Sequence, residues 1–183
     1  MRMRIISGSL KGRLINVPQS KLIRPTTDRV RETLFNLLNN RINFEDIDVL
    51  DFYSGSGSLG LECISRGAKY VTFIEKNFFI YKNLLENIKS LGVEEKCRVI
   101  KIDAADFSKR KPEKKYDLIL SDPPFFKDDI YFVIKNLTAN NYLKRDGFIV
   151  IERSIQSKEK DILNFKVEPF KIIGDACLYE IRQ

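Results

Sequence analysis

Short apolar runs alternate with longer amphipathic segments through most of the chain. The apolar runs, each bounded by polar or turn-forming residues, lie at residues 49–53, 70–75, 98–102, 116–121 and 148–152. Helical periodicity marks the segments between several of them, at residues 59–66, 78–91 and 130–140. Strands that alternate with helices are typical of a parallel, doubly wound sheet. The pattern therefore predicts an α/β fold built on a mostly parallel sheet.

The last part of the chain breaks this alternation. Two strand-like runs, at residues 165–173 and 176–182, are joined by Gly174 and Asp175 with no helix between them. A short connection containing glycine is typical of a β-hairpin. We therefore expect an antiparallel hairpin to close the sheet.

Residues 1–24 show a third pattern and are expected to form a basic N-terminal β-hairpin extension. Alternating stretches at residues 4–6 and 13–17 flank a glycine-containing segment, and Pro18 ends the second stretch. A single domain is expected at residues 25–183.

A helix is predicted where this domain begins. Its N-cap candidates are Thr26, Thr27 and Asp28, and its apolar face consists of Val30, Leu34, Leu37 and Leu38. Arg29 and Arg31 are expected to project from its first turn.

Length and composition restrict the class of protein. The 183 residues fit one domain, the first residues lack the apolar region of a secretory signal, and no apolar run approaches the length of a membrane span. We therefore expect a cytoplasmic protein with no membrane partner. The three cysteines lie in apolar segments, which favours buried, reduced thiols. The absence of histidine excludes imidazole-based catalysis and imidazole metal sites, and no metal is expected.

The positive charge is concentrated at the N-terminus. Residues 1–31 contain eight basic residues and one acidic residue, so they carry the whole net charge of +7 and the rest of the chain is neutral. A neutral body with a basic leading segment is typical of a protein that binds a polyanion, although a merely solvated basic terminus has the same composition. The candidate contacts to the phosphates of such a polyanion are Arg2, Arg4, Lys11, Arg13, Arg24 and Arg29.

A glycine-rich segment, DFYSGSGSLG at residues 51–60, lies between a predicted strand and a predicted helix. It contains G-x-G-x-x-G, and Glu75 ends the next strand twenty residues after Gly55. This spacing predicts a nucleotide cofactor whose ribose hydroxyls bind a carboxylate. Asp51 would repel the pyrophosphate of a dinucleotide, but it suits the cationic end of S-adenosylmethionine.

The predicted cofactor contacts follow from this placement. They are Asp51, Ser54, Gly55, Ser56, Gly57, Glu75, Asp103 and Ala104. Asp103 and Ala104 follow the third strand of the series, where an adenine edge would be recognised, and a simple helix N-cap at Asp103 is an equal alternative.

The segment SDPPFF at residues 121–126 ends another apolar run. Consecutive prolines cannot continue a hydrogen-bonded ladder, so the strand must stop there. A stiff turn is one interpretation. The other is a rigid rim at the carboxyl end of a strand, where open α/β sheets bind ligands. On this second interpretation the catalytic residues are Asp122, Pro123, Pro124 and Phe125.

Three segments match one family in order and spacing: RPTTDRVRETLFNLL at residues 24–38, LDFYSGSGSLGLECISRGA at 50–68 and DLILSDPPF at 117–125. The sequence resembles the bacterial RsmD-type methyltransferases, which methylate the exocyclic N2 amine of one guanine in 16S ribosomal RNA. The resemblance covers nearly the whole chain, and RPTTDRVRETLF is its most particular motif.

The resemblance implies a Rossmann-like class I fold that uses S-adenosylmethionine, with a mostly parallel seven-stranded sheet and a C-terminal antiparallel hairpin. It also implies 16S rRNA or the assembling small ribosomal subunit as partner, and a monomer. Asp122 and the Pro123 carbonyl would accept hydrogen bonds from the guanine amine, and Phe125 would stack on the base.

Departures from the family pattern affect nucleotide identity more than reaction type. Phe125 stands where tyrosine is frequent, Ser54 replaces a common alanine, and Leu37 replaces an aromatic residue. The runner-up is an adenine-N6 or other exocyclic-amine methyltransferase that acts on DNA or RNA. A hydride-transferring oxidoreductase and a non-catalytic RNA-binding module are the rival classes.

Overall fold

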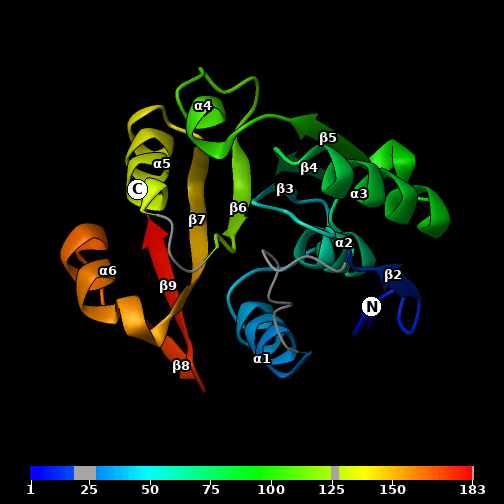
Figure 1. Cartoon of the computed structure of the whole chain (residues 1–183), viewed down its shortest axis with the longest axis horizontal. Coiled ribbons are helices and arrows are strands. Elements are labelled where there is room, and N and C mark those ends of the chain that lie inside the picture. The colour runs from blue at the N-terminus through cyan, green and yellow to red at the C-terminus, as the bar shows by residue number, and fades with distance from the viewer. Residues whose placement is uncertain (19–27, 125–127, 183) are drawn as a thin grey trace.

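The computed structural model describes residues 1–18, 28–124 and 128–182, except for the side chain of Asp28. Within these residues a seven-stranded sheet forms the centre of the molecule, in the order β5-β4-β3-β6-β7-β9-β8 (Figure 1). Its strands are β3 (Asp48–Phe52), β4 (Tyr70–Glu75), β5 (Cys97–Lys101), β6 (Tyr116–Ser121), β7 (Leu143–Ser154), β8 (Lys171–Ile173) and β9 (Ala176–Arg182). The first five pair in parallel, and β9 lies antiparallel between β7 and β8. The predicted fold class is confirmed.

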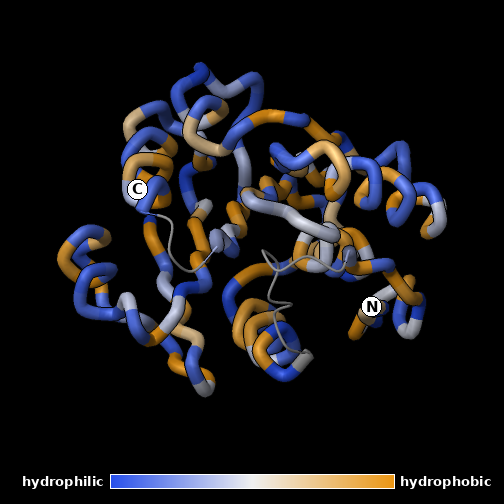
Figure 2. The backbone as a smooth tube through the Cα atoms, viewed as in Figure 1, coloured by the Kyte–Doolittle hydropathy of each residue, from blue (hydrophilic) through white to orange (hydrophobic). Residues whose placement is uncertain are grey.

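Helices cover both faces of the sheet. One core contains side chains of α1 (Asp28–Asn39), α2 (Ser58–Ser65) and α3 (Phe78–Leu91); the other contains side chains of α4 (Ala104–Ser108), α5 (Asp129–Ala139) and α6 (Lys158–Phe165). Along β3, Val49 enters the first core and Leu50 the second. A strand buried on both sides must be apolar at consecutive positions, which explains its continuous apolar run. Figure 2 shows hydrophobic residues along these central strands and mixed character along the helices.

The first strands form a separate hairpin that packs onto the domain. β1 (Arg2–Arg4) pairs antiparallel with β2 (Leu14–Asn16), and Met3 lies opposite Ile15. Met3, Ile5, Ile15 and Val17 are buried in the core that α1, α2 and α3 share. Burial of an aliphatic side chain is worth roughly 1.5–3 kcal/mol, so residues 1–18, termed the leader below, contribute directly to the stability of the domain.

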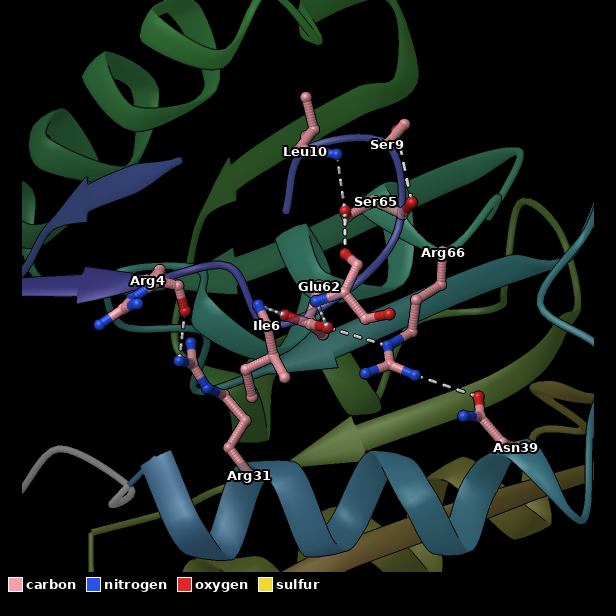
Figure 3. Close-up of polar contacts among 10 residues, drawn as sticks. Arg4, Ile6, Ser9, Leu10, Arg31, Asn39, Glu62, Ser65 and Arg66 are labelled. Carbon is pink, nitrogen blue, oxygen red and sulfur yellow. Dashed lines mark hydrogen bonds and ion pairs between the residues drawn. The ribbon is translucent and has the colours of Figure 1, made fainter. Parts of the chain in front are cut away.

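A fully buried carboxylate fixes the leader to α2. Glu62 accepts hydrogen bonds from the backbone N–H groups of Ile6 (2.8 Å) and Ser7 (3.0 Å), and from Nε of Arg66 (2.9 Å) (Figure 3). The Arg66 guanidinium lies 4.8 Å from the ring centre of Phe35 on α1. One side chain of α2 thus connects the leader, α2 and α1.

Further contacts hold the turn of the leader against the end of α2. Ser65 accepts from the N–H groups of Ser9 and Leu10, at 2.7 and 3.0 Å. Gly8 has a φ of +82°, and a Cβ there would lie 1.8 Å from the Ser65 carbonyl oxygen. Only glycine permits this approach.

The leader strands are displaced from the predicted ones. Strands at residues 4–6 and 13–17 were expected, but β1 ends at Arg4 because the N–H groups of Ile6 and Ser7 donate to Glu62 instead of a strand. Arg31 does not project into solvent as predicted: it is fully buried and donates to the Arg4 carbonyl. The division into an extension at residues 1–24 and a domain at 25–183 stays a prediction, and residues 19–24 lie outside the described part.

The predicted strand at residues 165–173 is wrong over its first half. Residues 158–165 form α6, and Lys166 ends this helix in the left-handed conformation with a φ of +58°. Pro169 cannot donate to a ladder, so β8 begins only at Lys171. Helix α6 was not predicted, and a helix at the position of α4 was implied only by the alternative that made Asp103 an N-cap. Across the described residues, no helix has the length and apolarity to cross a membrane.

Replacement of Glu62 by alanine should destabilise the fold by roughly 3–5 kcal/mol, because Arg66 and two N–H groups would remain buried without their acceptor. The measurement is urea unfolding followed by circular dichroism. Glu86→Ala is the matched control, since this glutamate is exposed on α3 and should change the free energy of unfolding by less than about 0.5 kcal/mol. Equal stabilities of the two variants would contradict the anchoring role of Glu62.

Candidate functional site

Four acidic residues lie at or beyond the carboxyl ends of parallel strands. Asp51 lies near the end of β3, Glu75 ends β4, and Asp103 and Asp122 follow β5 and β6 closely. β3 pairs with both β4 and β6, with Phe52 opposite Ile74 on one side and Ser121 on the other. The four acids therefore lie together at the carboxyl ends of the parallel strands, where open α/β folds bind ligands. This end of the sheet, with Asp51, Glu75, Asp103 and Asp122, is termed the acidic edge below.

The glycine-rich loop is attached to β4. Ser54 donates through its N–H and its hydroxyl to the Ile74 carbonyl, at 3.1 and 3.0 Å. Gly55 N donates to Glu75 at 3.1 Å, and Gly57 N donates to Ser54 O at 2.7 Å. These bonds fix the predicted cofactor contacts Ser54, Gly55 and Gly57 relative to Glu75.

The glycines of the loop serve different purposes. A Cβ at Gly57 would lie 2.4 Å from Leu84 Cδ1, and a Cβ at Gly60 would lie 2.3 Å from Phe73. These two glycines permit close packing of α2 against its neighbours. Among the described residues, a Cβ at Gly55 would meet only the Tyr53 carbonyl, at 3.8 Å. The described part of the chain therefore leaves space beside Gly55, into which a ligand can approach the backbone.

The pKa of Asp51 is more strongly shifted than that of Glu75. Asp51 is 1% exposed, and its Oδ2 accepts from Gly60 N at 3.0 Å. Burial raises its pKa to about 8; the Gly60 bond opposes the shift, and the charges of Asp122 and Glu75 add to it. Burial also raises the pKa of Glu75, against hydrogen bonds from Asn77, Gly55 and Lys76. Burial and mutual repulsion disfavour the ionised form of these carboxylates, so the site favours a cationic ligand that would compensate their charge.

Asp103 forms the N-cap that was the alternative to an adenine contact. Its Oδ1 accepts from Ala105 N at 2.9 Å at the start of α4, and its Oδ2 lies 3.2 Å from Lys76 Nζ. Ala104 is buried beside it. Capping occupies one carboxylate oxygen, so the predicted adenine contact stays a prediction.

The segment after β6 presents a partly open rim. Ser121 and Pro123 are buried, Asp122 is half-buried and Pro124 is exposed. The catalytic roles of Asp122, Pro123 and Pro124 stay predictions, and Phe125 lies outside the described residues.

The predicted RNA contacts are exposed where the structure describes them. Arg2, Arg4, Lys11, Arg13 and Arg29 are exposed, and Arg13 donates to the Ser90 carbonyl at 2.6 Å. Arg24 lies outside the described part of the chain.

Asn87 on α3 was not predicted, although it connects the leader to the glycine-rich loop. It is 1% exposed, and its Nδ2 donates to Asn16 O at 2.9 Å and to Ser56 O at 3.0 Å. Its Oδ1 accepts from Asn16 N at 2.8 Å. The available signal was an amide within the apolar face that includes Leu84 and Ile88.

The described residues contain no cluster of histidine, cysteine, aspartate or glutamate that could hold a metal ion.

Comparisons with known proteins identify the family. The family model described as "Conserved hypothetical protein 95" matches residues 3–181. The chain is 37% identical over 177 residues to "Ribosomal RNA small subunit methyltransferase D" of Escherichia coli, covering 96% of this chain and 87% of the relative. The chain belongs to the RsmD family of methyltransferases. The family predicted from the three motifs is confirmed.

Further relatives of this RsmD-family chain agree. The Haemophilus influenzae protein of the same name is 40% identical over 151 residues, covering 81% of this chain and 77% of the relative. A solved structure of the Escherichia coli protein yhhF superposes with a TM-score of 0.81 at 31% identity, covering 98% of each chain. A precorrin methyltransferase structure from Geobacter metallireducens has a TM-score of 0.67 at 17% identity, covering 83% and 75% of the two chains, which shows the fold alone.

Asp51→Asn should stabilise the ligand-free RsmD-family chain at alkaline pH. The folded-state pKa of Asp51, about 8, lies above its ordinary value of 3.8, so its stabilising contribution is complete below pH 3.8 and is lost as the pH rises to about 8. The amide oxygen of asparagine can still accept from Gly60 N. We expect the variant to exceed the parent by roughly 2–4 kcal/mol near pH 8.

The test compares urea unfolding of variant and parent at about pH 5 and about pH 8. The advantage of the variant should grow with pH. Asp146→Asn removes an exposed carboxylate and serves as the control. A pH-independent difference for Asp51→Asn would show that Asp51 is not the titrating group.

Proposed function

We propose that this chain transfers the methyl group of S-adenosylmethionine to the exocyclic N2 amine of a guanine in 16S rRNA of the small ribosomal subunit. The observation that carries the proposal is the convergence of Asp51, Glu75 and Asp122 beside the opening at Gly55. The name of the Escherichia coli and Haemophilus influenzae relatives supports the choice of RNA.

The residues at the acidic edge fit S-adenosylmethionine. Burial, with the added repulsion of Asp122 and Glu75, raises the pKa of Asp51, and the sulfonium and ammonium charges of the cofactor would oppose this shift by favouring the ionised carboxylate. Glu75 accepts backbone N–H bonds from Gly55, Asn77 and Lys76, and its remaining acceptor capacity suits a ribose hydroxyl. Asp103 and Ala104 would contact the adenine. When bound, the cofactor supplies a methyl group on a good leaving group.

The contribution of the protein to the chemistry is the placement of the acceptor amine. The carboxylate of Asp122 and the carbonyl of Pro123 would accept hydrogen bonds from the amine and direct its lone pair toward the methyl group. Phe125 would stack on the base, and Pro124 would keep this rim rigid. The chain contains no histidine, and orientation of the amine by Asp122 requires no imidazole base.

The exposed basic residues of the leader would contact the phosphates of the substrate. We propose 16S rRNA, alone or in the assembling small subunit, as the partner of a cytoplasmic monomer. Phosphate contacts are independent of sequence, so they would position the RNA while the Asp122 segment recognises the base.

Asp122→Ala should abolish methyl transfer but leave the cofactor affinity within a few-fold of the parent. Calorimetry measures binding of S-adenosylmethionine. The substrate for the transfer assay is 16S rRNA from a strain lacking the gene, and mass mapping of its nucleosides identifies the methylated product. Loss of an orienting contact costs roughly 100-fold in rate or more. Asp128→Ala, at an exposed partner of Lys160, is the control.

If Asp122→Ala transfers the methyl group at the parental rate, the SDPP segment has no catalytic role and is only a stiff turn after β6. Methylation of adenine, or of DNA, would replace the proposed function by the runner-up from the sequence. A parent that binds NAD and not S-adenosylmethionine would exclude a methyltransferase.

Charge removal in the leader should weaken RNA binding and flatten its salt dependence. A variant with Arg2, Arg4 and Lys11 replaced by alanine should lose about 0.7 from the slope of log K against log salt for each single-strand phosphate contact that is removed. Substitution is preferable to truncation, because Met3 and Ile5 are buried. Filter binding at several salt concentrations measures the slope.

The control variant removes the exposed Lys135 and Lys171 outside the leader. Calorimetry with S-adenosylmethionine verifies that the cofactor site is intact in both variants. If the slope of log K against log salt is the same for the leader variant and the control, the basic residues of the leader are solvated and do not bind RNA.

A further inference from the structure

The first turn of α3 exposes two adjacent aromatic rings. Phe78 is 45% exposed and Phe79 is 79% exposed. Their ring centres lie 5.8 Å apart with the planes at 70°, an edge-to-face arrangement. Isolated exposed apolar side chains are ordinary, but two contacting rings at the start of one helix form a defined apolar surface.

Two lysines from different elements surround Phe78. Lys82 Nζ, one turn along α3, lies 4.7 Å from the ring centre, and Lys101 Nζ, at the end of β5, lies 5.1 Å from it. Neither lysine makes an ion pair with any other described residue. The cations hold Phe78 in place, and Phe79 carries the larger exposed surface.

This surface adjoins the acidic edge. Glu75 lies opposite Lys101 in the register of β4 and β5, and it precedes Phe78 by three residues. In Figure 1 the start of α3 lies close to β4 and β5. Asp103, a nearby half-buried carboxylate, pairs with Lys76, and Glu75 is buried. The charged groups that contact the Phe78 ring within the described residues are the ammonium groups of Lys82 and Lys101.

An exposed ring beside ammonium groups that pair with no described carboxylate selects one kind of partner. An apolar protein surface would gain nothing from the lysines, since their desolvation would cost free energy. Single-stranded nucleic acid presents flat bases for the rings and phosphates for the lysines. Every base has a π face, so such a site tolerates any sequence.

We propose that Phe79, with Lys82 and Lys101, forms a second RNA site that binds a single-stranded nucleotide outside the catalytic position. A base of the substrate stacks on Phe79, and the two lysines contact its phosphates. The proposal rests on the proposed function, because it requires an RNA substrate.

The test measures binding of a single-stranded RNA oligonucleotide that spans the methylated nucleotide. Phe79→Ala should raise its Kd roughly tenfold, within the range of one stacked base, and Phe79→Trp should restore it. Leu163→Ala is the matched control, because Leu163 is 78% exposed on α6 and should leave the Kd unchanged. Lys82→Ala combined with Lys101→Ala should reduce the salt slope by about 1.4 for two phosphates.

The cofactor affinity of each variant separates this site from the acidic edge. S-adenosylmethionine should bind the parent and Phe79→Ala equally. Equal RNA affinities of Phe79→Ala and the parent overturn the second site and leave the proposed function intact. A parallel loss of cofactor affinity also overturns it and assigns Phe79 to the cofactor site. A parent that neither binds nor methylates RNA overturns both proposals.

Discussion

The register of β3 between β4 and β6 determines where the chemistry of this fold can lie. Side chains alternate along β3, so Val49 enters one core and Leu50 the other, while Asp51 follows on the face of Val49. A slip of one residue would exchange the two faces and move the carboxylate away from Gly60, whose N–H it accepts at 3.0 Å. Burial of Val49 and Leu50 in the two cores therefore fixes the position of Asp51 near the carboxyl end of β3. Its burial is the physical origin of its raised pKa.

A second buried carboxylate performs a structural role with similar physics. Glu62 is as inaccessible as Asp51, but it has three donors, including the cationic Arg66. Its charge is compensated within the protein, whereas that of Asp51 has one N–H and two nearby carboxylates. Glu62 therefore stabilises the fold, whereas the uncompensated carboxyl group of Asp51 is suited to bind a ligand.

The sequence predicted the features that depend on local pattern. Apolar runs marked the five parallel strands, glycine spacing marked the loop, and proline marked the end of β6. It did not predict contacts between distant segments. Asn87 lies 71 residues from Asn16, and Glu62 lies 56 residues from Ile6, so no local pattern reveals these hydrogen bonds.

Weak local signals account for the remaining differences. α4 has only five residues, and α6 is mostly polar, so neither shows a clear apolar period. The apolar pattern also did not predict that the Phe79 ring is exposed. An aromatic residue in a helical segment is ordinarily expected to face the core.

Asn87 gives the leader a consequence beyond stability. Its amide is saturated by Asn16 on β2 and by Ser56 in the glycine-rich loop, so these two segments share one buried hydrogen-bonding group. Separation of β2 from α3 would remove the partners of Oδ1 and of one N–H of this buried amide, and would so destabilise the side chain that also donates to the Ser56 carbonyl. The leader and the loop therefore belong to one cooperative opening unit, and their backbone amides should exchange with solvent together. By thermodynamic reciprocity, whatever orders the loop also orders the leader.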